Sequence, residues 1–174
     1  MRTSAYMRKT VSRHRMSIYV LICGLAMLVC SSACVSTKNA IDRRQKEIVA
    51  KFKSQKHWTD KMQLLIDIGM DYEPFGKEHQ TSSNLVEGCS TKVWIVAVKK
   101  DGKLHYYGYT DSLVLNGVLV VLFNVFNDSS PTDILSARFG FFDKLRIKEH
   151  LSSTRCVDVD IIIEKILSIA KSNL

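Results

Sequence analysis

Residues 93–109 read VWIVAVKKDGKLHYYGY, a pattern that predicts a β-hairpin. The first half, Val93–Val98, is rich in β-branched and aromatic residues, which are enriched in strands. Asp101-Gly102 then supplies two residues that tolerate positive φ, as both central positions of a tight hairpin turn require. Leu104–Tyr109, which contains three tyrosines, is the return strand. A short antiparallel sheet is therefore expected in the middle of the chain.

Helical patterns flank this hairpin on both sides. Apolar residues recur at helical spacing, and the predicted helices cover Ala40–Phe52, His57–Ile68, Leu113–Phe126, a segment from Pro131, and Val157–Ser172. Gly69 is the expected stop of the second helix. The third helix is apolar on nearly every side, so we expect it to lie buried against the sheet. The order of elements predicts an α+β fold, a small antiparallel sheet with helices packed on one face.

The positive charge of the chain is concentrated at its N-terminus. The chain has 174 residues, with 25 Lys and Arg against 17 Asp and Glu, a net charge of +8. Residues 1–41 hold six of the basic residues and no acidic one, which leaves residues 42–174 nearly neutral at +2. Binding to a phosphate backbone needs a clustered basic face, so no nucleic-acid partner is expected.

The sequence divides into a leader, residues 1–41, and one domain, residues 42–174. Basic residues precede the apolar run Ile18–Val29 and small residues follow it, which is the pattern of a secretory signal. Twelve apolar residues are marginal for a membrane span. The acid-free composition also suits an organelle transit peptide. A misassigned start codon would account for the segment with neither a signal nor a transit function. These alternatives stay open, as does a membrane tether through residues 18–29.

Two of the five cysteines lie in the predicted domain. Cys156 stands beside Arg155 at the predicted start of the last helix, a setting that can activate a thiol, although a small packed residue is the simpler interpretation. Cys89 follows Gly88 in the loop before the first strand, where a flexible glycine would let the thiol move between burial and exposure. The residues alone leave both a packed and a reactive Cys89 open.

Other chemistries have weaker support in the sequence. His105 or His150 could pair with Cys89 as in a cysteine hydrolase, because such partners meet in space rather than in sequence. The scattered cysteines and histidines lack the close ligand pairs of a zinc site, and no glycine-rich phosphate loop is present. Neither a metal ion nor a nucleotide cofactor is therefore expected.

Residues 84–94, which read NLVEGCSTKVW, resemble the active-cysteine segment of the SufE/CsdE family of sulfur-acceptor proteins. The resemblance continues in the same order through Asp111-Ser112, Gly117, SPTDIL (130–135) and HLSSTR (150–155), and the earlier Trp58, Leu65-Ile66 and Gly69 also fit. It covers the chain from about Gln45 to the C-terminus. Each block alone is modest evidence for the resemblance, but five blocks in the right order are quite specific to the family.

The resemblance implies a compact fold shared with iron–sulfur scaffold proteins and a role in sulfur transfer. Cys89 would accept persulfide sulfur from a cysteine desulfurase (SufS/CsdA-like), stimulate that enzyme, and pass the sulfur to a scaffold complex (SufBCD-like) that assembles iron–sulfur clusters. Pyridoxal phosphate would belong to the desulfurase, and this chain would bind no cofactor directly. It would be a transpersulfuration accessory protein rather than a stand-alone enzyme.

The resemblance also implies roles for residues around the cysteine. Gly88 and Ser90 flank Cys89, and Trp94 is expected to pack beneath the cysteine segment. Arg155 and Asp111 would either dock the desulfurase or hold that segment in place.

Two positions depart from the pattern of the family. Leu113 stands where the family often has an acid, and Val157-Asp158 stand where it usually has Asn-Gly. The resemblance implies that both positions lie near the docking surface for the desulfurase, so we expect the departures to affect affinity for that enzyme more than sulfur chemistry. A reducible thiol carrier belongs in a reducing compartment, so we expect the cytoplasm, with an organelle matrix or a membrane tether as alternatives. The rival functions are a binding module that kept the fold but lost the activity, and a cysteine hydrolase.

Overall fold

The structure is a computed structural model that describes residues 37–174. The apolar run Ile18–Val29 and the expected signal, transit or tether functions of the leader lie outside these residues. Across 37–174, the helices all fall short of the length or the apolar character that a bilayer crossing requires.

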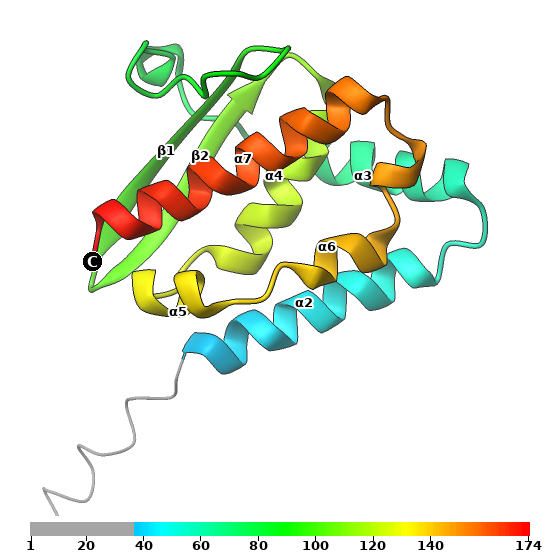
Figure 1. The fold of residues 1–174 in the computed structure, drawn as a ribbon, viewed down its shortest axis with the longest axis horizontal. Coiled ribbons are helices and arrows are strands. Elements are labelled where there is room, and N and C mark those ends of the chain that lie inside the picture. Colours follow the sequence, from blue (N-terminus) through cyan, green and yellow to red (C-terminus); the bar gives the residue numbers. More distant parts are fainter. Residues whose placement is uncertain (1–36) are drawn as a thin grey trace, which may run out of the picture. The chain divides into compact units, whose positions relative to one another are not determined.

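The described chain forms helices before and after a single β-hairpin (Figure 1). In order, the elements are α2 (Thr37–Lys53), α3 (Trp58–Met70), the 3₁₀ helix η2 (Lys77–His79), β1 (Val93–Lys100), β2 (Lys103–Thr110), α4 (Leu113–Phe126), α5 (Pro131–Ser136), α6 (Gly140–Leu145), the 3₁₀ helix η3 (Lys148–His150) and α7 (Ser153–Ser172). The described part of the chain is thus α+β, as predicted.

The hairpin has the predicted position and turn. β1 and β2 pair antiparallel, with Val93 opposite Thr110 at the open end and Lys100 opposite Lys103 at the turn. Asp101 and Gly102 have φ of 50° and 73°, as a turn matching the right-handed twist of the strands requires.

Only one face of this sheet is buried. Its inner face is built from the alternate residues Val93, Ile95, Leu104 and Tyr106, which are at most 1% exposed. The outer face includes Val98 and Tyr107, which are exposed. Helix α4 packs on β2 and is buried on nearly all sides, so the predictions of a one-sided sheet and of a buried third helix are confirmed. Ser112 caps α4, since its side chain accepts a hydrogen bond from the Leu115 N–H.

Gly69 does not end its helix, contrary to the prediction. It lies within α3, which continues to Met70, and it is buried where α3 crosses α4. A Cβ on Gly69 would stand 2.7 Å from the backbone nitrogen of Gly117, and one on Gly117 would stand 2.1 Å from the carbonyl oxygen of Leu65. The two glycines therefore allow the backbones of α3 and α4 to touch.

Two helix starts and one whole helix also differ from the sequence prediction. α2 begins at Thr37, so the boundary expected between residues 41 and 42 falls inside this helix, and Ile41 is fully buried in the core. α7 begins at Ser153 rather than Val157, because the Ser152 side chain caps it by accepting from the Arg155 N–H. Helix α6 was not expected, since Phe139 before it offers no side-chain cap.

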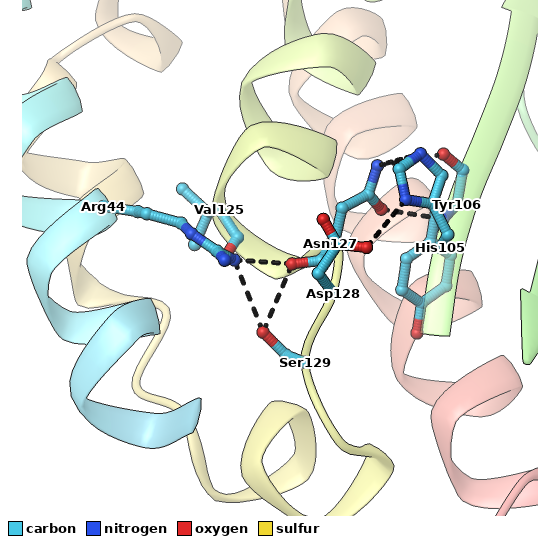
Figure 2. Close-up of polar contacts among 7 residues, drawn as sticks. All are labelled: Arg44, His105, Tyr106, Val125, Asn127, Asp128 and Ser129. Atoms are coloured by element: carbon cyan, nitrogen blue, oxygen red, sulfur yellow. Dashed lines mark hydrogen bonds and ion pairs between the residues drawn. The ribbon is translucent and has the colours of Figure 1, made fainter. Parts of the chain in front are cut away.

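The C-terminal end of α4 is tied to both α2 and β2 (Figure 2). Arg44 of α2 donates to the carbonyl oxygen of Val125 at 3.1 Å and also to that of Asn127. The Asn127 side chain accepts from the Tyr106 N–H at 2.7 Å. His105 lies 3.1 Å from the Asp128 carboxylate through Nδ1. This junction fixes the turn end of the hairpin, at the opposite end of the strands from Val93 and the loop that leads into it.

Candidate active site around Cys89

Cys89 lies in a short loop whose two ends are fixed to each other. The Val86 N–H donates to the Val93 carbonyl oxygen at 2.8 Å, and the Ile95 N–H donates to the Asn84 carbonyl oxygen at 2.9 Å. Residues 84–86 thereby pair antiparallel with the start of β1, although they are too short to form a strand of their own. We call residues 87–92, between these fixed ends, the cysteine loop.

The backbone of this loop turns at a glycine. Gly88 has a φ of +87°, a conformation that residues with a side chain rarely adopt. A Cβ at this position would also stand 3.3 Å from Cδ1 of Ile161 on α7. The backbone angle is therefore what favours glycine at this position, and the contact with α7 leaves little room for a larger side chain.

The Cys89 side chain is turned toward the protein. It is a free thiol, half-buried against the hydrophobic core, and its Sγ lies 3.9 Å from the main-chain oxygen of Asp158. Burial, and to a smaller extent the nearby negative charge of Asp158, together raise the pKa of the thiol from 9.0 to about 11. Because the thiolate is the nucleophilic form, this position of the loop disfavours attack by Cys89.

Asp158 holds the residue that follows the cysteine. Its carboxylate is 1% exposed and accepts two hydrogen bonds from Ser90, one from the backbone N–H at 2.7 Å and one from the hydroxyl at 2.6 Å. Arg155, one turn earlier on α7, lies 3.5 Å from the same carboxylate and donates to the Thr91 hydroxyl. We call this set of contacts, from Asp158 and Arg155 to Ser90 and Thr91, the Asp158 clamp.

The structure brings four of the residues expected at the site together: Gly88, Cys89, Ser90 and Arg155. The inward contacts of Arg155 favour the expectation that it holds the cysteine loop. Sequence reasoning missed the role of Thr91 and considered Asp158 only as a departure from the family pattern. A signal was present, because Asp158 continues the buried stripe of Ile162, Ile166 and Ala170 at intervals of four residues. A carboxylate on such a stripe needs polar partners.

The other two expected residues, Trp94 and Asp111, form a separate group with Tyr109. The Trp94 and Tyr109 rings are 6.0 Å apart across the strand pair. The Tyr109 hydroxyl donates to Asp111 at 2.6 Å, and this bond raises the pKa of Tyr109. Within residues 37–174 no side-chain bond joins this group to the cysteine loop, so a role for Trp94 beneath the loop or for Asp111 in holding it stays a prediction.

Neither candidate histidine bonds to Cys89 in the described part of the chain. His105 lies opposite Val98, five residues along β1 from Val93, a separation of about 17 Å at the rise of a strand. Figure 2 shows its ring engaged with Asn127 and Asp128. The ring of His150 stacks on Trp58 at 5.2 Å. Among residues 37–174 there is likewise no cluster of three or more His, Cys, Asp or Glu side chains that could hold a metal ion.

A family model matches this chain across the whole of the site. The family model described as "SufE: Fe-S metabolism associated domain" matches residues 46–170. A curated relative, the "Cysteine desulfuration protein SufE" of Wigglesworthia glossinidia brevipalpis, is 28% identical over 109 residues, which cover 62% of this chain and 76% of the relative.

A solved structure resembles the fold. The solution structure of a hypothetical protein from Thermus thermophilus matches with a TM-score of 0.63 at 17% identity, over 75% of this chain and 95% of that one. At this level of identity the likeness concerns the fold alone. The matched family region begins inside α2 and ends inside α7, so it includes the cysteine loop and both residues of α7 that hold it.

Proposed function

This chain belongs to the SufE family, and on that premise we propose that Cys89 accepts persulfide sulfur from a cysteine desulfurase. The observation that carries the proposal is a free thiol in a loop fixed at both ends, turned by a glycine, within the region that the family model matches. A thiol so placed can be sheltered in one loop position and presented in another without disturbing the sheet.

The transfer we propose is an exchange between sulfur atoms. The thiolate of Cys89 attacks the outer sulfur of the persulfide on the desulfurase cysteine, and a new bond forms from Sγ of Cys89 to that sulfur. The sulfur–sulfur bond of the donor breaks, and its electron pair remains on the donor cysteine as a thiolate. One persulfide is consumed and one is formed, so no external oxidant or reductant is needed.

In the proposed mechanism, docking of the desulfurase releases the cysteine loop. Both causes that raise the pKa of Cys89, burial and the charge of Asp158, depend on the loop lying against α7. Moving the loop outward removes both, so the pKa falls and the thiolate fraction rises at the moment when a donor is present. After transfer, return of the loop would shelter the persulfide from oxidation.

The partners follow the same proposal. A desulfurase is the donor, which agrees with the name of the curated relative, and the pyridoxal phosphate of the reaction belongs to that enzyme. An iron–sulfur scaffold complex is the proposed recipient.

Leu113 and Val157, at the two departures from the family pattern, are 59% and 55% exposed. We therefore expect the docking surface to be more apolar here than the family pattern would give. A reducing compartment, the cytoplasm first, is the proposed location.

Intact mass spectrometry tests the proposal directly. The chain is incubated with a cysteine desulfurase and L-cysteine, and we expect a gain of one sulfur atom on Cys89 that a reductant reverses. Cys89→Ser should gain none, because a hydroxyl cannot hold a stable persulfide, and it should fail to stimulate desulfurase turnover.

Cys156→Ser is the matched control and should accept sulfur at nearly the rate of the parent. Sulfur found on Cys156, or on neither cysteine, would overturn the assignment. Absence of sulfur together with acylation of Cys89 by an ester would instead favour the hydrolase, and absence of both would favour a binding module.

A further inference from the structure

A groove with positively charged rims runs along α2. It has a volume of about 700 Å³ and lies between α2 on one side and α6 with the segment leading into it on the other, two segments that lie side by side in Figure 1. Its lining includes Val49 and the buried Phe141, so the groove is partly apolar. None of the residues of the Asp158 clamp contributes to it.

The charge of this groove is not neutralised within the domain. Its lining includes five cations and one carboxylate, that of Asp42, and the cations are Lys38, Lys46, Lys53, Arg138 and Lys144. All five are exposed, and across residues 37–174 none of their side chains forms an ion pair. Arg146, Lys148 and Arg155, by contrast, each pair with a carboxylate. A concave surface lined by one sign of charge attracts a ligand of the opposite sign.

The shape of the groove favours an elongated ligand. On α2 its lining extends from Lys38 to Lys53, and these fifteen steps along the helix span about 22 Å at the rise of an α-helix. A helix of about four turns matches that length, whereas a compact metabolite would occupy a fraction of it. Cationic rims over a partly apolar lining complement a helix with one acidic and one apolar face, the arrangement by which grooves bind amphipathic helices.

We propose that this groove docks an acidic amphipathic helix of a protein partner. Two other occupants fit less well. Residues 1–36 carry basic residues and no acid, so the leader has the same charge as the groove. A second copy of the chain related by two-fold symmetry would bring the same cations face to face.

The proposed docking surface is separate from the cysteine site. In Figure 1, α2 lies along the opposite side of the domain from the start of α7, whose first two turns carry Arg155 and Asp158. A partner held along α2 would therefore leave the cysteine loop free to meet a desulfurase. This inference does not depend on the role proposed for Cys89.

Fluorescence anisotropy with the full chain tests the inference. The probe is a labelled synthetic peptide of about four helical turns, with leucines on one face and glutamates on the other, and the comparison peptide has lysine at every glutamate. The groove variant is Lys46→Glu with Lys53→Glu and Lys144→Glu. The control variant is Lys51→Glu with Lys100→Glu and Lys103→Glu, which changes the net charge equally outside the groove.

We expect the parent to bind the glutamate peptide and not the lysine peptide. The groove variant should lose about tenfold in affinity or more, and the control variant less than about threefold, because charges in direct apposition outweigh distant screened ones. Ala50→Trp, which fills the groove without changing its charge, should also weaken binding several-fold.

If the groove variant and the control variant lost the same affinity for the glutamate peptide, net charge alone would explain the binding and the proposal would be overturned. Failure of the parent to bind, or equal binding of the lysine peptide, would also overturn it. Vesicles with a third of their lipid as phosphatidylserine are measured in parallel. If the chain bound these vesicles through the groove but did not bind the glutamate peptide, the ligand of the groove would be a membrane surface, and the proposed helix would be wrong. Sulfur acceptance by Cys89 is assayed separately and should be retained in every variant.

Discussion

Asp158 is the residue through which the reactivity of Cys89 can be changed without touching the cysteine. Asp158→Asn keeps the shape of the side chain but removes its negative charge and weakens its hydrogen bonds with Ser90. Loss of the charge removes a repulsion on the thiolate, and weaker bonds to Ser90 let the loop move away from α7 and expose the thiol. The pKa of Cys89 should therefore fall from about 11. We expect the rate of alkylation by iodoacetamide to rise at a lower pH than in the parent, and to be several-fold faster at pH 8.

The matched control for this prediction is Asp160→Asn. Asp160 lies two residues further along α7, is exposed and pairs with Lys148, so the same loss of charge occurs away from the thiol. Its alkylation profile should follow that of the parent. If the two variants gave the same profile, the clamp would have no specific effect on Cys89.

The functional residues of the site were predictable only in part. Cys89 and Gly88 belong to a motif of consecutive residues, which can be recognised in the sequence. Asp158 belongs to no such motif. Its partner Ser90 is 68 residues away in the sequence, and only the folding of the cysteine loop onto α7 brings them together. Arg155 was identified through its motif, but its inward direction follows from the position of Asp158 one turn later.

At the scale of elements, the crossing of α3 and α4 is the contact least tolerant of change. Gly117→Ala would place a methyl group 2.1 Å from the carbonyl oxygen of Leu65, so the two helices must move apart. We expect a loss of more than about 3 kcal/mol in the free energy of unfolding, at the upper end of single substitutions, or failure to fold. Chemical denaturation monitored by circular dichroism measures the loss.

Gly140→Ala is the comparison for this prediction. Gly140 opens α6, and a Cβ there would meet nothing within 4 Å, so alanine should stabilise the protein by up to about 1 kcal/mol through helix propensity. Equal effects of the two substitutions would mean that the close approach of α3 and α4 does not limit packing.

The elements that sequence predicted well carry their signals locally. Asp101-Gly102 specifies the turn, and the apolar run behind the Ser112 cap specifies α4. α6 lacks both signals, since no side chain caps its start and Arg146, in a left-handed conformation with φ of 60°, ends it where a glycine would be expected. Gly69 was misread because a glycine needed for helix contact and a glycine that stops a helix look the same in one sequence.

For the whole molecule, the part of the chain that the structure describes begins with α2. We expect a chain that begins at residue 37 to keep the thermal stability of the described domain and to accept sulfur normally. A chain that begins at residue 42 loses the first turn of α2 and the fully buried Ile41, which should cost about 2–5 kcal/mol, as truncation of a core aliphatic side chain does.

Thermal melts of the two truncated chains, side by side, measure this difference. The same melting temperature for both would show that Ile41 contributes little to the core. A chain from residue 37 that fails to fold would show that the fold needs residues before α2.

The paired backbone at the two ends of the cysteine loop sets how far the sulfur can travel. Cys89 is three residues from Val86 and four from Val93, and those two residues are bonded to each other. A fully extended chain covers about 3.3–3.6 Å per residue, so the Cys89 backbone can move no more than about 10 Å from Val86 while the sheet stays intact. The loop is a short tether rather than a long arm, and the donor cysteine has to come to the rim of the sheet to meet it.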